Sequence, residues 1–225
     1  MSILLAAKCA PDEKILAAVD KAGIEAVEIY TSKGILSDVK GVIKVCQKFP
    51  FKYAVHAPND DFNPDKLLDF VSGINAELIN FHDIFWEDEW LKIIKVFEGS
   101  GIKLCVENIK SINDCFRFER RYGFGRCLDM EHLQFEISGV FEEEFVAVLS
   151  KSFHIHLTGY FSGSTLWHTH IHHSPKHNKK MLELIRKSGY NGMVVSEAEV
   201  KFQTYNEFRD LKKYFDRNIK HNTDF

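Results

Sequence analysis

Residues 103–129 read KLCVENIKSINDCFRFERRYGFGRCLD and hold one complete repeat of the pattern that decides the fold. The short apolar-rich runs Lys103–Glu107 and Arg126–Asp129 predict two strands buried on both faces. Between them, the segment that begins at Ser111 is suited to cap the start of a helix. A strand, a helix and the next strand within about 25 residues make one βα unit, because parallel strands need a crossover connection.

The same pattern recurs along the rest of the chain. Six further runs predict strands: Ile3–Cys9, Ala26–Tyr30, Tyr53–His56, Leu78–His82, Phe153–Leu157 and Met193–Glu197. Their midpoints lie roughly 25 residues apart, except for a gap of about 40 before the last, and amphipathic segments fill the intervals. Eight such units predict an α/β protein, a closed (β/α)8 TIM barrel, since an open doubly wound sheet would not need eight regular repeats. No linker divides the chain, so we expect residues 1–225 to form one domain.

Composition narrows the class of protein. Hydrophobic residues make up 45% of the chain, and 29 basic against 32 acidic residues give a net charge of −3, too balanced to attract nucleic acid or anionic lipid. No apolar run is long enough for a membrane helix, and the N-terminus lacks the features of a secretory signal. Five cysteines without a C-x-x-C pair make a disulfide framework or a thiolate zinc site improbable. We therefore expect a cytoplasmic protein with no membrane contact.

The residues that end the predicted strands carry the functional signal. Six consecutive strands end in His, Glu or Asp: His56, His82, Glu107, Asp129, His156 and Glu197. In a barrel of this kind the active site forms at the carboxyl ends of the strands. Carboxylates and imidazoles that converge there need a cation to neutralise them. The sequence therefore predicts a site for a divalent metal such as Zn, Mn, Co or Fe(II).

Strand alternation supports this assignment. If the six residues point inward, so do the residues two positions earlier, which are Ala54, Asn80, Cys105, Cys127, His154 and Val195. The opposite face is then mostly apolar and faces the helices. We expect His154 to serve packing and Glu28, near the end of the second strand, to be structural.

This constellation resembles the xylose-isomerase-like barrels, which include sugar isomerases and epimerases and the endonuclease IV-type nucleases (AP endonuclease family 2). The resemblance spans nearly the whole chain and implies that Glu107, Asp129, His156 and Glu197 hold a metal. The nuclease-type members bind up to three zinc ions, and the resemblance to them adds His56, His82 and His132. Their Asp-x-His pair after the seventh strand matches His170-Ile-His172 or, in another register, His168-Thr-His170, with His in place of Asp. One to three divalent ions are therefore expected.

The first functional hypothesis is proton transfer on a small sugar-like substrate, with Glu107 and Glu197 as the acid and base beside the metal. No Lys or Arg lies between Thr158 and Pro175, which favours a neutral substrate over a phosphorylated one. Three aromatic residues in the predicted loops at the strand ends, Trp86, Tyr160 and Trp167, are candidates to stack on a sugar ring.

Two alternatives remain open. The first is phosphodiester hydrolysis by clustered zinc ions, which the ligand set favours. However, seven acids and no base in the loops after the third and fourth strands would repel DNA: Asp60, Asp61, Asp65, Asp83, Glu87, Asp88 and Glu89. The second is a metal-binding barrel whose catalysis is lost or redirected. We expect a small-molecule substrate rather than nucleic acid, and a monomer or homodimer.

Overall fold

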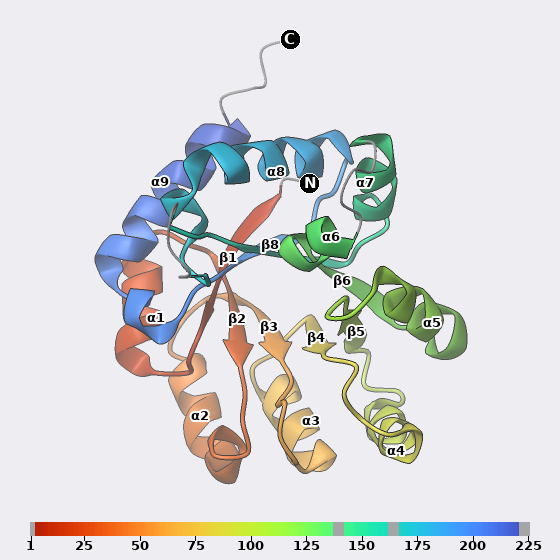
Figure 1. The fold of residues 1–225 in the computed structure, drawn as a ribbon. Coiled ribbons are helices and arrows are strands. Elements are labelled where there is room, and N and C mark those ends of the chain that lie inside the picture. The colour runs from red at the N-terminus through yellow and green to blue at the C-terminus, as the bar shows by residue number, and fades with distance from the viewer. Residues whose placement is uncertain (1–2, 137–141, 162–166, 221–225) are drawn as a thin grey trace.

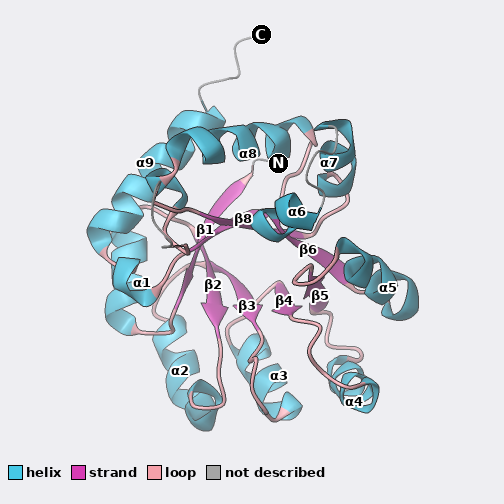
Figure 2. Cartoon of the chain, in the orientation of Figure 1, coloured by secondary structure: helices cyan, strands magenta, loops and turns pink. Residues whose placement is uncertain are grey.

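The computed structural model describes residues 3–136, 142–161 and 167–220. Eight parallel strands close into one barrel in the order β1 to β8, with β1 hydrogen-bonded to both β2 and β8. The helices lie outside the barrel and surround it (Figures 1 and 2). The predicted (β/α)8 TIM barrel is confirmed.

The elements follow one another as the repeat requires. The strands are β1 (Leu4–Cys9), β2 (Ala26–Tyr30), β3 (Lys52–His56), β4 (Leu78–Phe81), β5 (Lys103–Glu107), β6 (Gly125–Asp129), β7 (His154–Thr158) and β8 (Met193–Glu197). The α-helices are α1 (Glu13–Lys21), α2 (Val39–Cys46), α3 (Pro64–Gly73), α4 (Glu87–Phe97), α5 (Ile112–Tyr122), α6 (Met130–Glu136), α7 (Glu142–Leu149), α8 (Pro175–Lys187) and α9 (Tyr205–Lys220). Three short 3₁₀ segments complete the order: η1 (Ile35–Asp38), η2 (Ile171–His173) and η3 (Val200–Phe202).

Local sequence explains where several helices begin and end. The Asn63 side chain accepts hydrogen bonds from the backbone N–H groups of Asp65 and Lys66, and Pro64 occupies the first turn of α3. Ser111 caps α5 in the same way, as its sequence predicts. Gly123 ends α5 in the left-handed conformation at φ 71°, which a residue with a Cβ rarely adopts.

Two layers of apolar side chains position the site. The larger packs the outer faces of the strands against the helices, with Val55, Val106 and Leu128 fully buried. The smaller fills the barrel itself with compact residues: Ala6, Ala26, Ala54, Leu78, Cys105, Cys127, Met193 and Val195. This alternation agrees with the inward and outward faces that the sequence predicts. The five cysteines are buried and unpaired.

Two strand ends differ from prediction. β7 extends to Thr158, so His156 lies in the middle of the strand rather than at its end, paired in register with Asp129 of β6. β4 ends at Phe81, one residue before His82. The gap of about 40 residues before β8 holds η2 and α8. Within the described residues no helix has the length and apolar character needed to cross a bilayer.

Candidate metal centre

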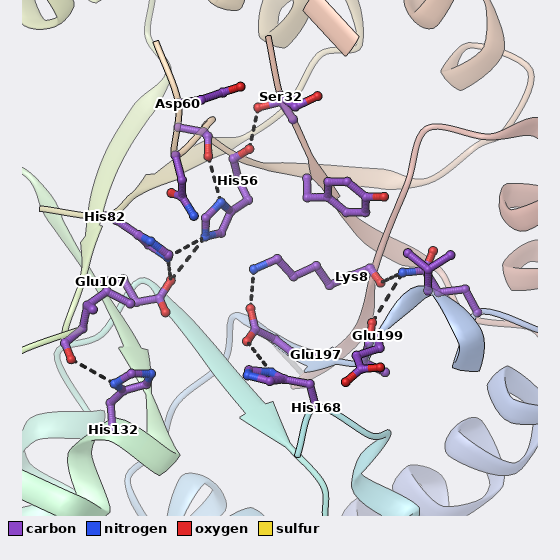
Figure 3. Close-up of a pocket in the computed structure, with 18 residues that line it drawn as sticks. Lys8, Ser32, His56, Asp60, His82, Glu107, His132, His168, Glu197 and Glu199 are labelled. Carbon is purple, nitrogen blue, oxygen red and sulfur yellow. Dashed lines mark hydrogen bonds and ion pairs between the residues drawn. The ribbon is translucent and has the colours of Figure 1, made fainter. Parts of the chain in front are cut away.

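A cavity of about 750 Å³ opens at the carboxyl ends of the strands. Its wall includes five of the predicted metal ligands: His56, His82, Glu107, His132 and Glu197. Figure 3 shows His56 and His82 beside Glu107 on one side of this cavity, and Glu197 between Lys8 and His168 on the other. The structure therefore brings side chains from β1, β3, β5 and β8 and from the segments after β4, β6 and β7 to one mouth, as a barrel of this kind requires.

The imidazole of His156 lies at the centre of the polar cluster. Its Nδ1 atom is 3.2 Å from Glu107 Oε2 and 3.0 Å from Glu197 Oε1. Asp129, His156 and Glu197 each place a ligand atom within 4.8 Å of the other two. One ring nitrogen and the two carboxylates of Asp129 and Glu197 thus lie close enough to share an ion, and the Glu107 carboxylate lies beside the same nitrogen. This is a donor set that suits a divalent ion.

A buried carboxylate beneath the cluster orients that ring. Glu28 Oε2 accepts hydrogen bonds from His156 Nε2 at 3.0 Å and from His154 Nε2 at 2.6 Å, and all three side chains are fully buried. Because Nε2 donates to Glu28, Nδ1 is the nitrogen that faces Glu107 and Glu197. A carboxylate behind a histidine is the usual arrangement that fixes a metal-binding imidazole. Glu28 and His154 therefore support the cluster directly, a role beyond the packing expected of His154.

Asp129 is held by backbone and amide contacts. Its Oδ1 accepts the backbone N–H of His132 at 2.8 Å, and its own N–H donates to Asn108 Oδ1 at 2.7 Å. Burial, together with the negative charges of Glu197 and Glu107, raises the pKa of Asp129 to about 7. A bound cation would offset both effects.

A second cluster adjoins the first and shares Glu107 with it. His56 Nε2 lies 3.0 Å from His82 Nε2, and both nitrogens are 3.6 Å from Glu107 Oε2. His56 Nδ1 donates to Ala57 O at 2.9 Å, so its Nε2 lone pair faces the cluster. Asn80 Nδ2 donates to Glu107 Oε2 at 2.6 Å and fixes that carboxylate. These three ligand atoms could hold a second ion beside the first.

Lys8 is a member of the site that the sequence analysis missed. Its Nζ atom donates to Glu197 Oε1 (Figure 3). The same atom lies 3.5 Å from Glu28 Oε1. Burial acts to lower the pKa of Lys8, but Glu197 and Glu28 raise it above its ordinary value, so the ammonium stays charged. Among the described residues that line the cavity, Lys8 is the one Lys or Arg. A lysine within an otherwise apolar strand was the signal that could have found it.

The histidines after β7 separate into different environments. His170 is fully buried, with Nδ1 3.1 Å from Ser196 Oγ and Nε2 donating to Phe202 O, so both ring nitrogens are engaged away from the cavity. His172 contacts Glu207 of α9. His168 is the one that reaches the mouth: it adopts φ 55°, and its Nδ1 lies 3.9 Å from Glu197 Oε2. Of the two registers considered, neither brings both histidines of its pair to the cavity.

The predicted aromatic residues lie outside the cavity wall. Trp86 is 79% exposed at the start of α4, and Trp167 packs on Tyr160 with ring centroids 5.4 Å apart. Tyr30, at the end of β2, lines the cavity instead. His132, the remaining predicted ligand, lines the mouth and donates from Nδ1 to Ile109 O.

Solved structures share this architecture over nearly the whole chain. A D-allulose 3-epimerase from Methylomonas sp. superposes with a TM-score of 0.66 at 10% identity, covering 96% of this chain and 98% of that one. The IolI protein with a binding zinc atom gives a TM-score of 0.67 at 14% identity, covering 99% and 100%. This chain has their fold. A phosphoribosylanthranilate isomerase from Thermotoga maritima, at 15% identity and a TM-score of 0.57, covers 97% and 98%. Neither a protein-family model nor a curated protein matches the sequence.

These likenesses agree with the resemblance seen in the strand endings, because a sugar epimerase barrel is among the neighbours. At such low identity they establish the fold alone. The chemistry must be argued from the site itself.

Proposed function

We propose that this protein is a divalent-metal-dependent epimerase or isomerase that moves a proton on a small, neutral hydroxy-carbonyl substrate of the sugar type. One observation carries the proposal. His156 Nδ1, held from behind by Glu28, lies within 3.2 Å of both Glu107 and Glu197, and these two glutamates also line the open cavity. Metal ligation and proton transfer can therefore occur at the same pair of carboxylates.

The residues present fit a divalent metal. Glu107, Asp129, His156 and Glu197 would hold it, and the raised pKa of Asp129 marks a surplus of buried negative charge that a cation would relieve. When bound, such an ion would polarise a substrate carbonyl and stabilise the charge that develops on its oxygen. Zn, Mn and Co all suit these nitrogen and oxygen donors.

The chain's own residues then perform the proton transfer. Lys8 and His156 lower the pKa of Glu197 against the effect of burial, so this carboxylate is ionised and able to accept a proton. Glu107 is also ionised, and Asn80 holds its orientation. One glutamate would take the proton from the carbon beside the carbonyl, and return of a proton to the other face, or to the neighbouring carbon, completes epimerisation or isomerisation.

The charge of the cavity favours a neutral substrate. Asp60, Glu107, Glu197 and Glu199 line it, whereas the charge of Lys8 is already balanced by Glu197 and Glu28. A phosphate group would therefore meet repulsion. We also propose a single domain over residues 1–225, a monomeric or homodimeric state and a cytoplasmic location, to which five buried thiols are suited.

The test incubates the protein in D₂O with a panel of ketoses and aldoses in the presence of Mn²⁺, Co²⁺ or Zn²⁺. NMR then measures the exchange of sugar hydrogen for deuterium. We expect metal-dependent deuterium incorporation beside the carbonyl. Glu107→Gln and Glu197→Gln should each reduce it at least 100-fold, since general acid–base groups contribute about 10²–10⁴. Glu183→Gln, on the outer helix α8, is the matched control. Full activity of Glu197→Gln would exclude the two-glutamate mechanism.

Zinc-dependent phosphodiester hydrolysis is the second candidate function. It is favoured by Glu107, which the two clusters of ligand-type residues share. A second ion held by His56, His82 and Glu107 would lie beside the first, as in enzymes that use paired metals on phosphate esters. The acidic rim is also less repulsive than its sequence suggests, because four of the seven acids lie against bases: Asp61–Lys33, Asp83–Arg117, Glu87–Arg121 and Asp88–Lys92. Hydrolysis of a duplex with an abasic site, without exchange on any sugar, would replace the first proposal with this one.

A further inference from the structure

Two histidines and a glutamate gather away from the barrel mouth, where the segment after β7 meets the last helix. Their Nε2 atoms converge on one carboxylate oxygen: Glu207 Oε2 is 2.8 Å from His173 Nε2 and 3.4 Å from His172 Nε2. All three ligand atoms lie within 4.8 Å of one another. None of these residues lines the mouth cavity.

We propose that His172, His173 and Glu207, here called the clasp, form a metal site of their own that takes a divalent transition ion such as Zn²⁺. Two imidazole nitrogens and one carboxylate oxygen are a donor set typical of such ions, and water can complete the coordination. The clasp is independent of the proposed function, since it shares no residue with Glu107, Asp129, His156 or Glu197.

The surroundings of the clasp are those of a shielded site. The side chains of His172, His173 and Glu207 are 15%, 18% and 25% exposed. The ring of Phe161 packs on His173 with centroids 4.6 Å apart, and Phe202 packs on it at 5.6 Å. The two histidine rings contact each other at 4.1 Å. Water is thus restricted around the ligand atoms, which strengthens binding of a cation.

One atom of the clasp is not accounted for by protein contacts. His172 Nδ1 is buried and has no hydrogen-bond partner, although buried polar atoms are almost always paired. The unpaired Nδ1 atom costs free energy, and the other ring nitrogen, Nε2, faces Glu207. An ion bound at Nε2 would place the ring proton on Nδ1; the convergence of both Nε2 atoms on Glu207 Oε2 is the observation that favours a metal.

A metal at the clasp would join two segments that shape the mouth. His172 and His173 lie in η2, four and five residues after His168, while Glu207 lies in the first turn of α9, just after η3. His168 and Val200 of these segments line the cavity. The bound ion would therefore hold the β7–α8 segment against α9 and steady His168 beside Glu197.

The experiment measures the number of zinc ions bound per chain. The full chain is loaded with ZnCl₂, passed through a desalting column and analysed for metal per chain. We expect Glu207→Gln and His172→Gln/His173→Gln each to hold one ion fewer than wild type, with at least a tenfold loss of affinity in competition with a chelator. His177→Gln is the matched control, because His177 lies 3.0 Å from Glu131 and, among the described residues, no second histidine pairs with that carboxylate. Glu197→Gln should keep the clasp ion whatever becomes of the proposed function.

A measurement on the unaltered protein guards against misfolded variants. In ¹⁵N-labelled wild type, zinc should shift the imidazole resonances of His172 and His173 and leave those of His177 in place. Equal zinc content in wild type and Glu207→Gln, or unshifted resonances of His172 and His173, would overturn the proposal.

Discussion

Replacing Lys8 with methionine tests the charge balance at the barrel mouth. The ammonium contacts Glu197 Oε1 and lies 3.5 Å from Glu28 Oε1, and its side chain is only 18% exposed. Methionine keeps most of the length and apolar volume but removes the charge. The variant therefore removes the lysine charge from two buried carboxylates, which keep their contacts with His156.

The magnitude follows from these distances. Two unit charges 3.5 Å apart attract by roughly 5 kcal/mol at an effective dielectric constant of about 20. The desolvation of the ammonium offsets part of this gain, and loss of one partner from a buried pair typically costs about 3–5 kcal/mol. We expect the free energy of unfolding of metal-free Lys8→Met to fall by about that amount.

Metal binding should restore the free energy of unfolding that the Lys8→Met variant loses. Without Lys8, a divalent ion no longer shares Glu197 with an ammonium, so its affinity for the mouth should rise at least tenfold, which corresponds to about 1.4 kcal/mol. Urea unfolding, in a chelator and then in saturating Zn²⁺ or Mn²⁺, measures both effects. The control is Lys33→Met, since Lys33 and Asp61 pair at 3.2 Å with both side chains more than half exposed. If metal-free Lys8→Met is as stable as wild type, or gains no more from metal, Lys8 is not the counter-charge of this site.

Three further results are expected. Glu28→Gln should weaken metal binding about 10–100-fold in chelator competition, because the carboxylate that orients His156 is lost; unchanged affinity would remove Glu28 from that role. Metal affinity should rise as the pH increases above 6.5, because the acidic groups around His156, against the effect of burial, raise its pKa above the ordinary value and this proton must leave before Nδ1 can bind; a calorimetric affinity that does not change with pH would contradict this order. Burial lowers the pKa of His170 from 6.5 to about 3, so its stabilising contribution is complete above pH 6.5 and declines as the pH falls toward 3, by up to about 1.4 kcal/mol per pH unit. His170→Gln should flatten the acid limb of the stability curve, and an identical slope in wild type and variant would show that His170 is not the group responsible.

The barrel was predictable because its signals are local. Each strand is a short apolar run, and several helices begin at capping residues such as Asn63 and Ser111. These signals involve residues that are close together in the chain. The position of His156 within its strand was harder to predict from the sequence. Its strand continues to Thr158, and the stagger between neighbouring strands, which sets it level with Asp129, depends on the closed barrel.

The contents of the site were predicted only in part. Ligand-type residues at strand ends identify the mouth: His56, His82, Glu107 and Glu197 line the cavity there, and Asp129 and His156 have ligand atoms within 4.8 Å of one on Glu197. The loop histidines could not be assigned from spacing, because a loop's path sets whether a side chain turns inward, as His168 does, or outward to a helix, as His172 does.

Sequence by itself determined the repeat, the alternation of faces and the kind of ligand at each strand end, since these depend on neighbours a few residues apart. Tertiary structure decided which groups meet. Lys8 reaches Glu197 across 189 residues because β1 closes the barrel against β8, and Glu28 reaches His156 across 128. These long-range contacts determine which nitrogen of His156 faces the carboxylates and which cation balances them, because charge and hydrogen-bond direction act through space rather than along the chain.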